Sequence, residues 1–196
     1  MTGLLIAFEG LDQSGKETQA KRLGAELEAA GRLVRLLSFP DYETPIGAEI
    51  GRALHGEHDY PSDVMQLLYM ANRYEYRRRL EDWLRAGDIV LCDRYVASSV
   101  AYGETQGLDP AWVAAVQRHL PQPGLTLLLD IAPETAVARK AAGRDKFERD
   151  LVLLTRVRES YRRQAQHAGW VRIDGERPKD EIAAEISRVV RDRLAV

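Results

Sequence analysis

The chain has 196 residues, 45% of them hydrophobic and 30% charged, so we expect one soluble globular domain spanning 1–196. Its 28 Lys and Arg residues against 30 Asp and Glu give a net charge of −2, which predicts neither nucleic acid nor an anionic membrane as partner. The single cysteine, Cys92, precludes an internal disulfide, and no apolar run approaches the ~18 residues of a membrane span. With the first strand starting almost at Met1 and leaving no room for a signal peptide, the expected location is the cytoplasm.

The first expected strand, Leu4 to Phe8, leads through a glycine-bounded loop into a helix that begins at Lys16. Gly10 and Gly15 allow the backbone to turn tightly, so that successive N–H groups point at one anion. The helix adds its positive dipole end, and Lys16 adds a full charge. This pattern predicts a loop that binds the phosphates of ATP. The expected contacts come from Gly10, Leu11, Asp12, Gln13, Ser14, Gly15, Lys16, Glu17 and Thr18.

Glu17 occupies the position after the lysine, where the loop motif asks for a Ser or Thr hydroxyl that holds Mg²⁺. A carboxylate can ligate Mg²⁺ directly or through water, but it can also repel a triphosphate. Alternatively, Thr18 takes over the hydroxyl role, or other acids hold the metal. The sequence leaves these alternatives open, and we predict Asp93 and Glu17 as the metal ligands.

The rest of the chain alternates short apolar runs with helical patterns. Further strands are expected at 33–39, 88–92, 125–131 and 170–173. Helices are expected at 46–55, 62–86, 96–104, 110–120, 133–142, 150–168 and 178–194. Five such strands predict an α/β fold, with a five-stranded parallel sheet and helices on both faces. Ligands of these folds bind beyond the carboxyl ends of the strands.

Asp93 and Arg94 follow an expected strand, so they emerge at the same sheet edge as the phosphate loop. In the functional interpretation, Asp93 holds Mg²⁺ through a water molecule and Arg94 binds a phosphoryl oxygen, because a guanidinium forms bidentate hydrogen bonds with phosphate. The alternative is a local ion pair that ends the strand.

A charged segment, 143–148, lies between two expected helices and follows Arg139 and Lys140. It could close over a bound nucleotide, exclude water and bring an arginine to the transferring phosphoryl group. A solvated connection between helices would have a similar composition.

Tyr69 and Arg73 are four residues apart and therefore share one helix face. An aromatic plane beside a guanidinium suits a nucleobase pocket. A tyrosine that packs on the stem of an arginine is the alternative interpretation.

Taken together, these segments resemble the thymidylate kinase family. The similarity runs nearly end to end and includes FEGLDQSGKETQAKRL, SFPDY, LLYMANRYE, LCDRYVASSVAYG, LLLDIAPETAVAR, RDKFE and IDGERPKDEI. It implies a P-loop kinase fold with a lid at about 139–149, and transfer of the γ-phosphoryl group of ATP to dTMP in dTTP synthesis. It also implies Mg²⁺ as cofactor and a homodimer.

The resemblance implies roles for individual residues. Tyr69 would stack on thymine and Arg73 would read its carbonyl, while residues 175–178 would border the adenine of ATP. Catalytic roles are implied for Asp12, Lys16, Arg94 and Arg144. Contacts with dTMP are implied for Asp12, Phe39, Pro40, Tyr69, Arg73, Arg94, Ser99, Tyr102 and Glu148, and lid contacts for Arg139, Arg144 and Lys146.

Four positions depart from the family pattern. Glu17 replaces the usual hydroxyl residue. Gln13 stands where some members have a basic residue, so we expect Arg139 and Arg144 to supply the positive charge that stabilises the transition state. Asp41 or Tyr42 stands where many members have an arginine for the acceptor phosphate, and Ser99 stands where some have Asn.

Two other functions stay open on the sequence. One is a kinase for another nucleotide or deoxynucleoside. The other is a catalytically silent nucleotide-binding protein, which Glu17 makes conceivable and which the intact Asp12, Lys16, Asp93 and Arg94 oppose.

Overall fold

The computed structural model describes residues 3–139 and 151–194. Its sheet is parallel throughout, with the strand order β2-β3-β1-β4-β5, so the predicted fold class is confirmed. The strands are β1 (Leu4–Glu9), β2 (Val34–Ser38), β3 (Ile89–Asp93), β4 (Leu125–Asp130) and β5 (Trp170–Asp174). Each lies within about a residue of its predicted start because a short apolar run between turn residues marks a buried strand clearly.

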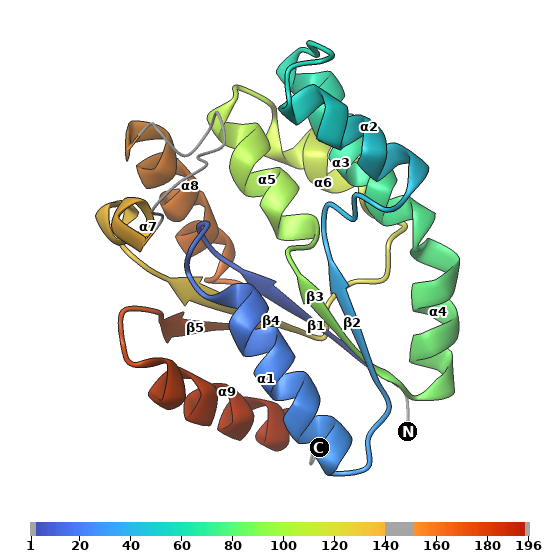
Figure 1. The fold of residues 1–196 in the computed structure, drawn as a ribbon, viewed down its shortest axis with the longest axis vertical. Helices are drawn as coiled ribbons and strands as arrows, with labels where there is room; N and C mark the ends of the chain where they lie inside the picture. Colours follow the sequence, from blue (N-terminus) through green and yellow to red (C-terminus); the bar gives the residue numbers. More distant parts are fainter. Residues whose placement is uncertain (1–2, 140–150, 195–196) are drawn as a thin grey trace.

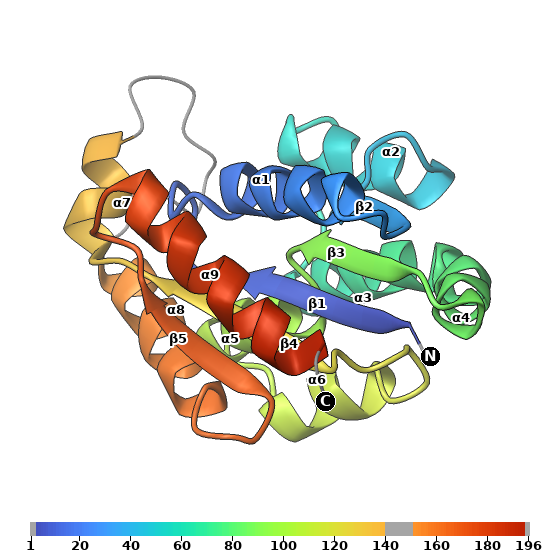
Figure 2. The ribbon, with the colours of Figure 1, turned by 90° about the horizontal axis from the view of Figure 1, so that it is seen from below.

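Helices cover both faces of this sheet (Figure 1). They are α1 (Lys16–Ala29), α2 (Pro45–Leu54), α3 (Ser62–Glu75), α4 (Arg77–Ala86), α5 (Val96–Thr105), α6 (Pro110–Val116), α7 (Pro133–Arg139), α8 (Leu151–Gln164) and α9 (Lys179–Leu194). Figure 2 shows the sheet between α1 on one side and α5 and α6 on the other. None of the described helices is long and apolar enough to cross a membrane.

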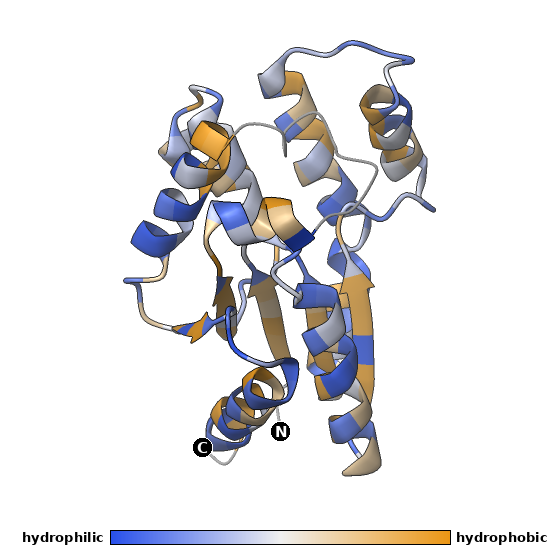
Figure 3. Ribbon diagram, turned by 60° about the vertical axis from the view of Figure 1, so that its left-hand side comes forward, coloured by the Kyte–Doolittle hydropathy of each residue, from blue (hydrophilic) through white to orange (hydrophobic). Residues whose placement is uncertain are grey.

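The central strand β1 builds core on both faces of the sheet. Ile6 and Phe8 pack with residues of α1 and α9, whereas Leu5 and Ala7 point to the opposite face, which α4 covers. This alternation follows from the two-residue period of a strand, and it explains why β1 is apolar at consecutive positions. Figure 3, which is coloured by hydropathy, shows that the strands are mostly apolar whereas the outer turns of α1 are polar.

The expected helix 62–86 is two helices, so that prediction was wrong. The chain breaks at Tyr76 (φ −91°, ψ −7°) between α3 and α4. The Tyr76 hydroxyl donates to the carboxylate of Asp41, and its ring meets Phe39 edge-on at 5.6 Å. These contacts with a distant turn override the helical pattern. The break also lets α3 face the loops above the sheet while α4 packs on β3 through the buried Leu80.

The strand register brings the predicted functional segments to one edge of the sheet. Phe8 of β1 and Ser38 of β2 both lie beside Asp93 of β3. The segments that follow these three strands therefore leave the sheet side by side. They are the phosphate loop, the Phe39–Pro40 turn and the turn at Arg94.

Gly47 in the first turn of α2 tests how tightly this edge is packed. A Cβ at Gly47 would overlap the carbonyl oxygen of Asp41, whereas a Cβ at Gly51 would meet Tyr42 at an ordinary 3.5 Å. We expect Gly47→Ala to lower the free energy of unfolding by about 1–3 kcal/mol. The control Gly51→Ala should raise it by about 0.5–1 kcal/mol because alanine restricts the unfolded chain. Urea unfolding measures both, and equal stabilities would contradict the expected overlap.

Candidate active site

The loop between β1 and α1 has the tight backbone that its glycines predict. Gly10 and Gly15 have φ of +140° and +93°, and Gln13 between them also has a positive φ of 63°. A Cβ on Gly10 would lie 2.5 Å from the carbonyl oxygen of Leu129. The loop therefore lies directly against β4, and only glycine fits at that contact.

Lys16 is buried at the start of α1, and its Nζ donates to the carbonyl oxygen of Leu11 at 2.9 Å. Burial, with a smaller contribution from Arg94, lowers the pKa of the Lys16 ammonium. The carboxylates of Asp12, Asp93 and Glu9 act in the opposite direction. Lys16 thus sits under the loop it was predicted to serve, surrounded by charged groups of both signs.

Arg94 leaves β3 in the left-handed region, with φ 64°. Its backbone N–H donates to the carbonyl oxygen of Phe8 at 2.9 Å, which fixes the turn to β1. Its guanidinium forms an ion pair with Asp12 of the phosphate loop and donates to the hydroxyl of Tyr102 at 3.3 Å. The structure thus brings together three residues that were predicted for the site, and the partner of Arg94 is Asp12.

Glu9, at the end of β1, is a buried acid that the sequence analysis did not single out. Its carboxylate accepts from the Tyr95 N–H at 2.8 Å, from the Ser98 hydroxyl at 2.7 Å and from the Tyr161 hydroxyl at 3.1 Å. Burial, and then the charge of Glu9, raise the pKa of Tyr161, so that this hydroxyl stays a donor. The available signal was an acid at the end of an otherwise apolar strand, which needs buried partners.

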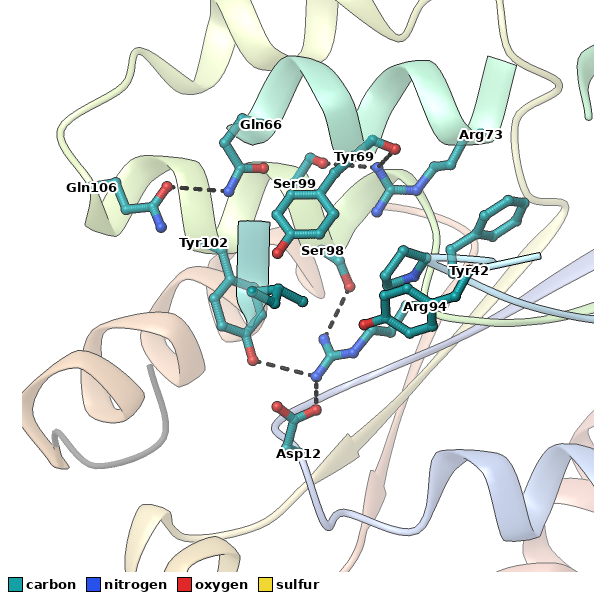
Figure 4. A pocket seen from close by; sticks show the side chains of 13 residues that line it. Asp12, Tyr42, Gln66, Tyr69, Arg73, Arg94, Ser98, Ser99, Tyr102 and Gln106 are labelled. Carbon is teal, nitrogen blue, oxygen red and sulfur yellow. Dashed lines mark hydrogen bonds and ion pairs between the residues drawn. The ribbon is translucent and has the colours of Figure 1, made fainter. Parts of the chain in front are cut away.

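A cavity of about 170 Å³ opens beside Arg94 (Figure 4), more than tenfold the ~15 Å³ that one ordered water needs. The predicted residues that line it are Asp12, Phe39, Pro40, Tyr69, Arg73, Arg94, Ser99 and Tyr102. Its walls also contain Tyr42, Leu54, Gln66, Ser98 and Gln106, which were not predicted to contact a ligand. The remaining residue predicted for this pocket, Glu148, lies outside the described residues.

Arg73 forms part of the cavity wall and is only 3% exposed. Its Nη1 donates to the Ser99 hydroxyl at 2.8 Å and to the carbonyl oxygen of Tyr69 at 3.2 Å. The guanidinium lies 5.9 Å from the ring centroid of Phe39. Burial lowers the pKa of Arg73. Tyr69 and Arg73 share one helix face, as predicted, and both line the cavity.

The turn that supplies Phe39 and Pro40 is attached to α3 by Asn72, a buried residue that the sequence analysis did not single out. Asn72 Oδ1 accepts from the Asp41 N–H at 2.9 Å, and its Nδ2 donates to the Thr44 hydroxyl at 2.7 Å. Asp41 is one of the two residues that stand where many family members have an arginine, and its carboxylate accepts a hydrogen bond from the Tyr76 hydroxyl. Asn72 is thus a positioning residue, and its partners in the turn, Asp41 and Thr44, lie about 30 residues away, beyond the reach of local patterns.

The two predicted metal ligands differ in their surroundings. Asp93 Oδ1 is buried at the end of β3 and has no hydrogen-bond partner among the described residues. The Glu17 carboxylate is exposed and pairs with Lys21 at 2.5 Å, one turn along α1. Within 3–139 and 151–194, no three His, Cys, Asp or Glu side chains gather to hold a metal. Asp93 therefore has an oxygen available for a cation or its water, and Glu17 is engaged elsewhere.

Arg139 connects the phosphate loop to the turn after β5. Its Nη1 donates to the carbonyl oxygen of Gln13 at 3.2 Å, and its Nη2 donates to that of Gly175 at 3.0 Å. This places a predicted lid arginine next to the loop. Arg144 and Lys146, the other predicted lid residues, lie outside the described residues.

A family model described as thymidylate kinase matches residues 8–186 of the chain. A thymidylate kinase of Arabidopsis thaliana is 35% identical over 192 residues, which cover 98% of this chain and 72% of that protein. A probable thymidylate kinase of Pyrobaculum calidifontis is 38% identical over 200 residues, which cover 98% of both chains. The solved structure of thymidylate kinase from Candida albicans superimposes with a TM-score of 0.83 at 27% identity, covering 98% of this chain and 92% of that one.

Glu9 provides a test of how the site is held together. Glu9→Ala removes the acceptor of the Tyr95 N–H and the acceptor that the Ser98 and Tyr161 hydroxyls share, which leaves these two hydroxyls only each other. We expect the free energy of unfolding to fall by about 3 kcal/mol, since these donors are buried beside cations. Glu28→Ala, at an exposed position of α1, is the control and should change it by less than ~0.5 kcal/mol. Urea unfolding distinguishes the two, and similar losses would show that Glu9 is not a structural centre.

Proposed function

The chain belongs to the thymidylate kinase family, and we propose that it transfers the γ-phosphoryl group of ATP to dTMP, forming dTDP, with the residues described above. One observation carries the assignment of the site. Arg94 contacts Asp12 of the phosphate loop on one side, and Ser98 and Tyr102 of the cavity on the other. A single cation therefore faces both the place for ATP phosphates and the place for an acceptor.

On the donor side, the amides of the 10–15 loop and the first turn of α1 bind the phosphates of ATP. Lys16 and Arg94 neutralise charge on the transferring group. Phosphoryl transfer asks little covalent chemistry of a protein, so positioning and charge stabilisation supply most of the rate acceleration. Arg139 adds a cation next to Gln13, the position where some family members have a basic residue.

On the acceptor side, Tyr69 stacks on the thymine ring, and Arg73 donates to a ring carbonyl. Phe39 and Pro40 close one wall, and Tyr102 lies next to the sugar, where its ring disfavours a ribose 2′-hydroxyl. Asp41 is acidic and bonded to Tyr76, so it does not replace the arginine that many members use. Arg94 therefore takes the acceptor phosphate as well as the transferring group.

Mg²⁺ is part of the proposal, and the described residues fit it. The buried Oδ1 of Asp93, which has no partner within 3–139 and 151–194, can hold the ion through water. A site with one protein carboxylate suits Mg²⁺, which keeps several waters beside substrate phosphates. When bound, the ion supplies positive charge to the phosphates. Glu17 pairs with Lys21, so we assign the protein's main contact to Asp93.

The remaining parts of the proposal rest on the family resemblance for the lid and the homodimer, and on the length and composition of the chain for the single domain and the location. They are a single domain whose lid spans about 139–149, a homodimer and a cytoplasmic location. Arg139 at the edge of that segment, next to the phosphate loop, is consistent with the lid.

The activity is tested by measuring ADP release with ATP, Mg²⁺ and each of dTMP, dUMP, dCMP and AMP as acceptor. We expect the highest kcat/KM with dTMP. A preference for AMP or dCMP would favour another nucleotide kinase, and no turnover with any acceptor, in a protein that binds ATP, would favour a silent binding protein.

Arg94→Ala removes the cation shared by both nucleotides. We expect kcat to fall by about 10²–10³-fold, as for the loss of one preorganised donor to a transition state. Arg94→Lys should recover only part of this loss, because an ammonium cannot replace a bidentate guanidinium. The control is Arg77→Ala, which removes an exposed arginine that pairs with Glu81 on α4. A kcat of Arg94→Ala equal to that of the control would refute the role of Arg94.

A further inference from the structure

Three side chains of α3 face the cavity together. Gln66, Tyr69 and Arg73 lie three and seven residues apart along the helix, so they share one face, and all three line the cavity. Gln66 is only 2% exposed. Its Nε2 donates to Gln106 Oε1 at 3.1 Å, and Figure 4 shows this pair of amides at one end of the cavity.

Two buried polar atoms of this helix face have no hydrogen-bond partner among the described residues. They are the Oε1 of Gln66, an acceptor, and the Nε of Arg73, a donor. A buried polar group without a partner costs about 1–3 kcal/mol, so such groups in a cavity wall point to a ligand that satisfies them. Here the ligand should present one acceptor and one donor to α3.

The edge of a pyrimidine base supplies such a combination. Thymine and uracil present a carbonyl oxygen beside an N3–H group, whereas cytosine presents an amino group beside a bare N3. Arg73 can only donate. Gln66 donates one amide N–H to Gln106, and its Oε1, which has no partner among the described residues, is left to accept. In donor and acceptor type, these two atoms therefore match the edge of thymine or uracil and oppose that of cytosine.

We propose that Gln66 is a specificity-determining residue whose Oε1 accepts the N3–H of the acceptor base. The hydrogen bond to Gln106 holds the Gln66 amide so that the Oε1 of Gln66 is directed toward the ligand. This inference rests on the proposed function, because it assigns the base edge within the proposed dTMP pocket. A cytosine ring would place its N3 lone pair against Oε1 and its amino group against the guanidinium, so both contacts would be lost.

The first test replaces Gln66 by methionine, which has a similar length and no amide. We expect kcat/KM for dTMP and dUMP to fall by about 10- to 100-fold, the loss of one buried hydrogen bond. The value for dCMP should change little, so that the ratio of dTMP to dCMP narrows. Gln166→Met, at an exposed position, is the matched control and should leave all three values unchanged.

Two outcomes of this test overturn the inference. One is an equal loss with all three acceptors, which would show that Gln66 only supports the fold. The other is an unchanged kcat/KM for dTMP and dUMP, which would show that Gln66 does not contact the base. Failure of the proposed function looks different, because the wild-type protein itself would then prefer AMP or dCMP, or would phosphorylate none of the acceptors.

A second measurement uses the wild-type protein, so its result does not depend on whether a variant folds. The N3–H of 5-bromo-dUMP is more acidic than that of dTMP, so a rise in pH ionises its base first. Loss of that proton removes the donor that Gln66 requires. We expect calorimetry without ATP to show that 5-bromo-dUMP binds more weakly as its base ionises, relative to dTMP at the same pH. Unchanged or tighter binding, the result if Arg73 alone reads the edge, overturns the inference.

Discussion

A single residue in an unfavourable backbone conformation, Arg94, joins the phosphate loop to the acceptor cavity. A left-handed conformation costs a non-glycine residue about 1–2 kcal/mol, and several contacts offset this cost. The Arg94 N–H donates to β1, and its side chain meets Asp12, Ser98 and Tyr102. The strain is thus fixed by neighbours on three other elements, which is how a preorganised cation can be kept in place before substrate arrives.

The same region concentrates buried charge, and this explains why its residues depend on one another. Lys16 and Arg73 are nearly fully buried, and so is the carboxylate of Glu9. The charge of Glu9 opposes the fall that burial causes in the pKa of both cations. Buried charges are tolerated only when they are compensated, so Glu9 supports the site without facing a substrate.

The sequence predicted the sheet, the phosphate loop and the segments that meet at its edge, because each depends on local patterns of apolar and turn residues. It did not predict the break at Tyr76, which depends on contacts with Phe39 and Asp41 more than 30 residues away. Glu9, Asn72 and Gln66 were missed for the same reason, since their significance comes from partners distant in the chain. Helical spacing and the family resemblance indicated Tyr69 and Arg73. The Gln66 oxygen, which has no partner among the described residues, became visible only in three dimensions.

In the proposed reaction one arginine serves two phosphates, and the cations around the cavity give the reason. Among the described lining residues, only Arg73 and Arg94 carry a positive charge. Arg73 donates a hydrogen bond to Ser99 and is buried beside the proposed base site, so it is not placed to bind a phosphate. The Phe39–Pro40 turn contributes Asp41 instead of a cation. In the proposed reaction, an entering acceptor phosphate therefore competes with Asp12 for the guanidinium of Arg94. The ion pair both orients that guanidinium and sets the electrostatic cost of exchanging one anionic partner for another.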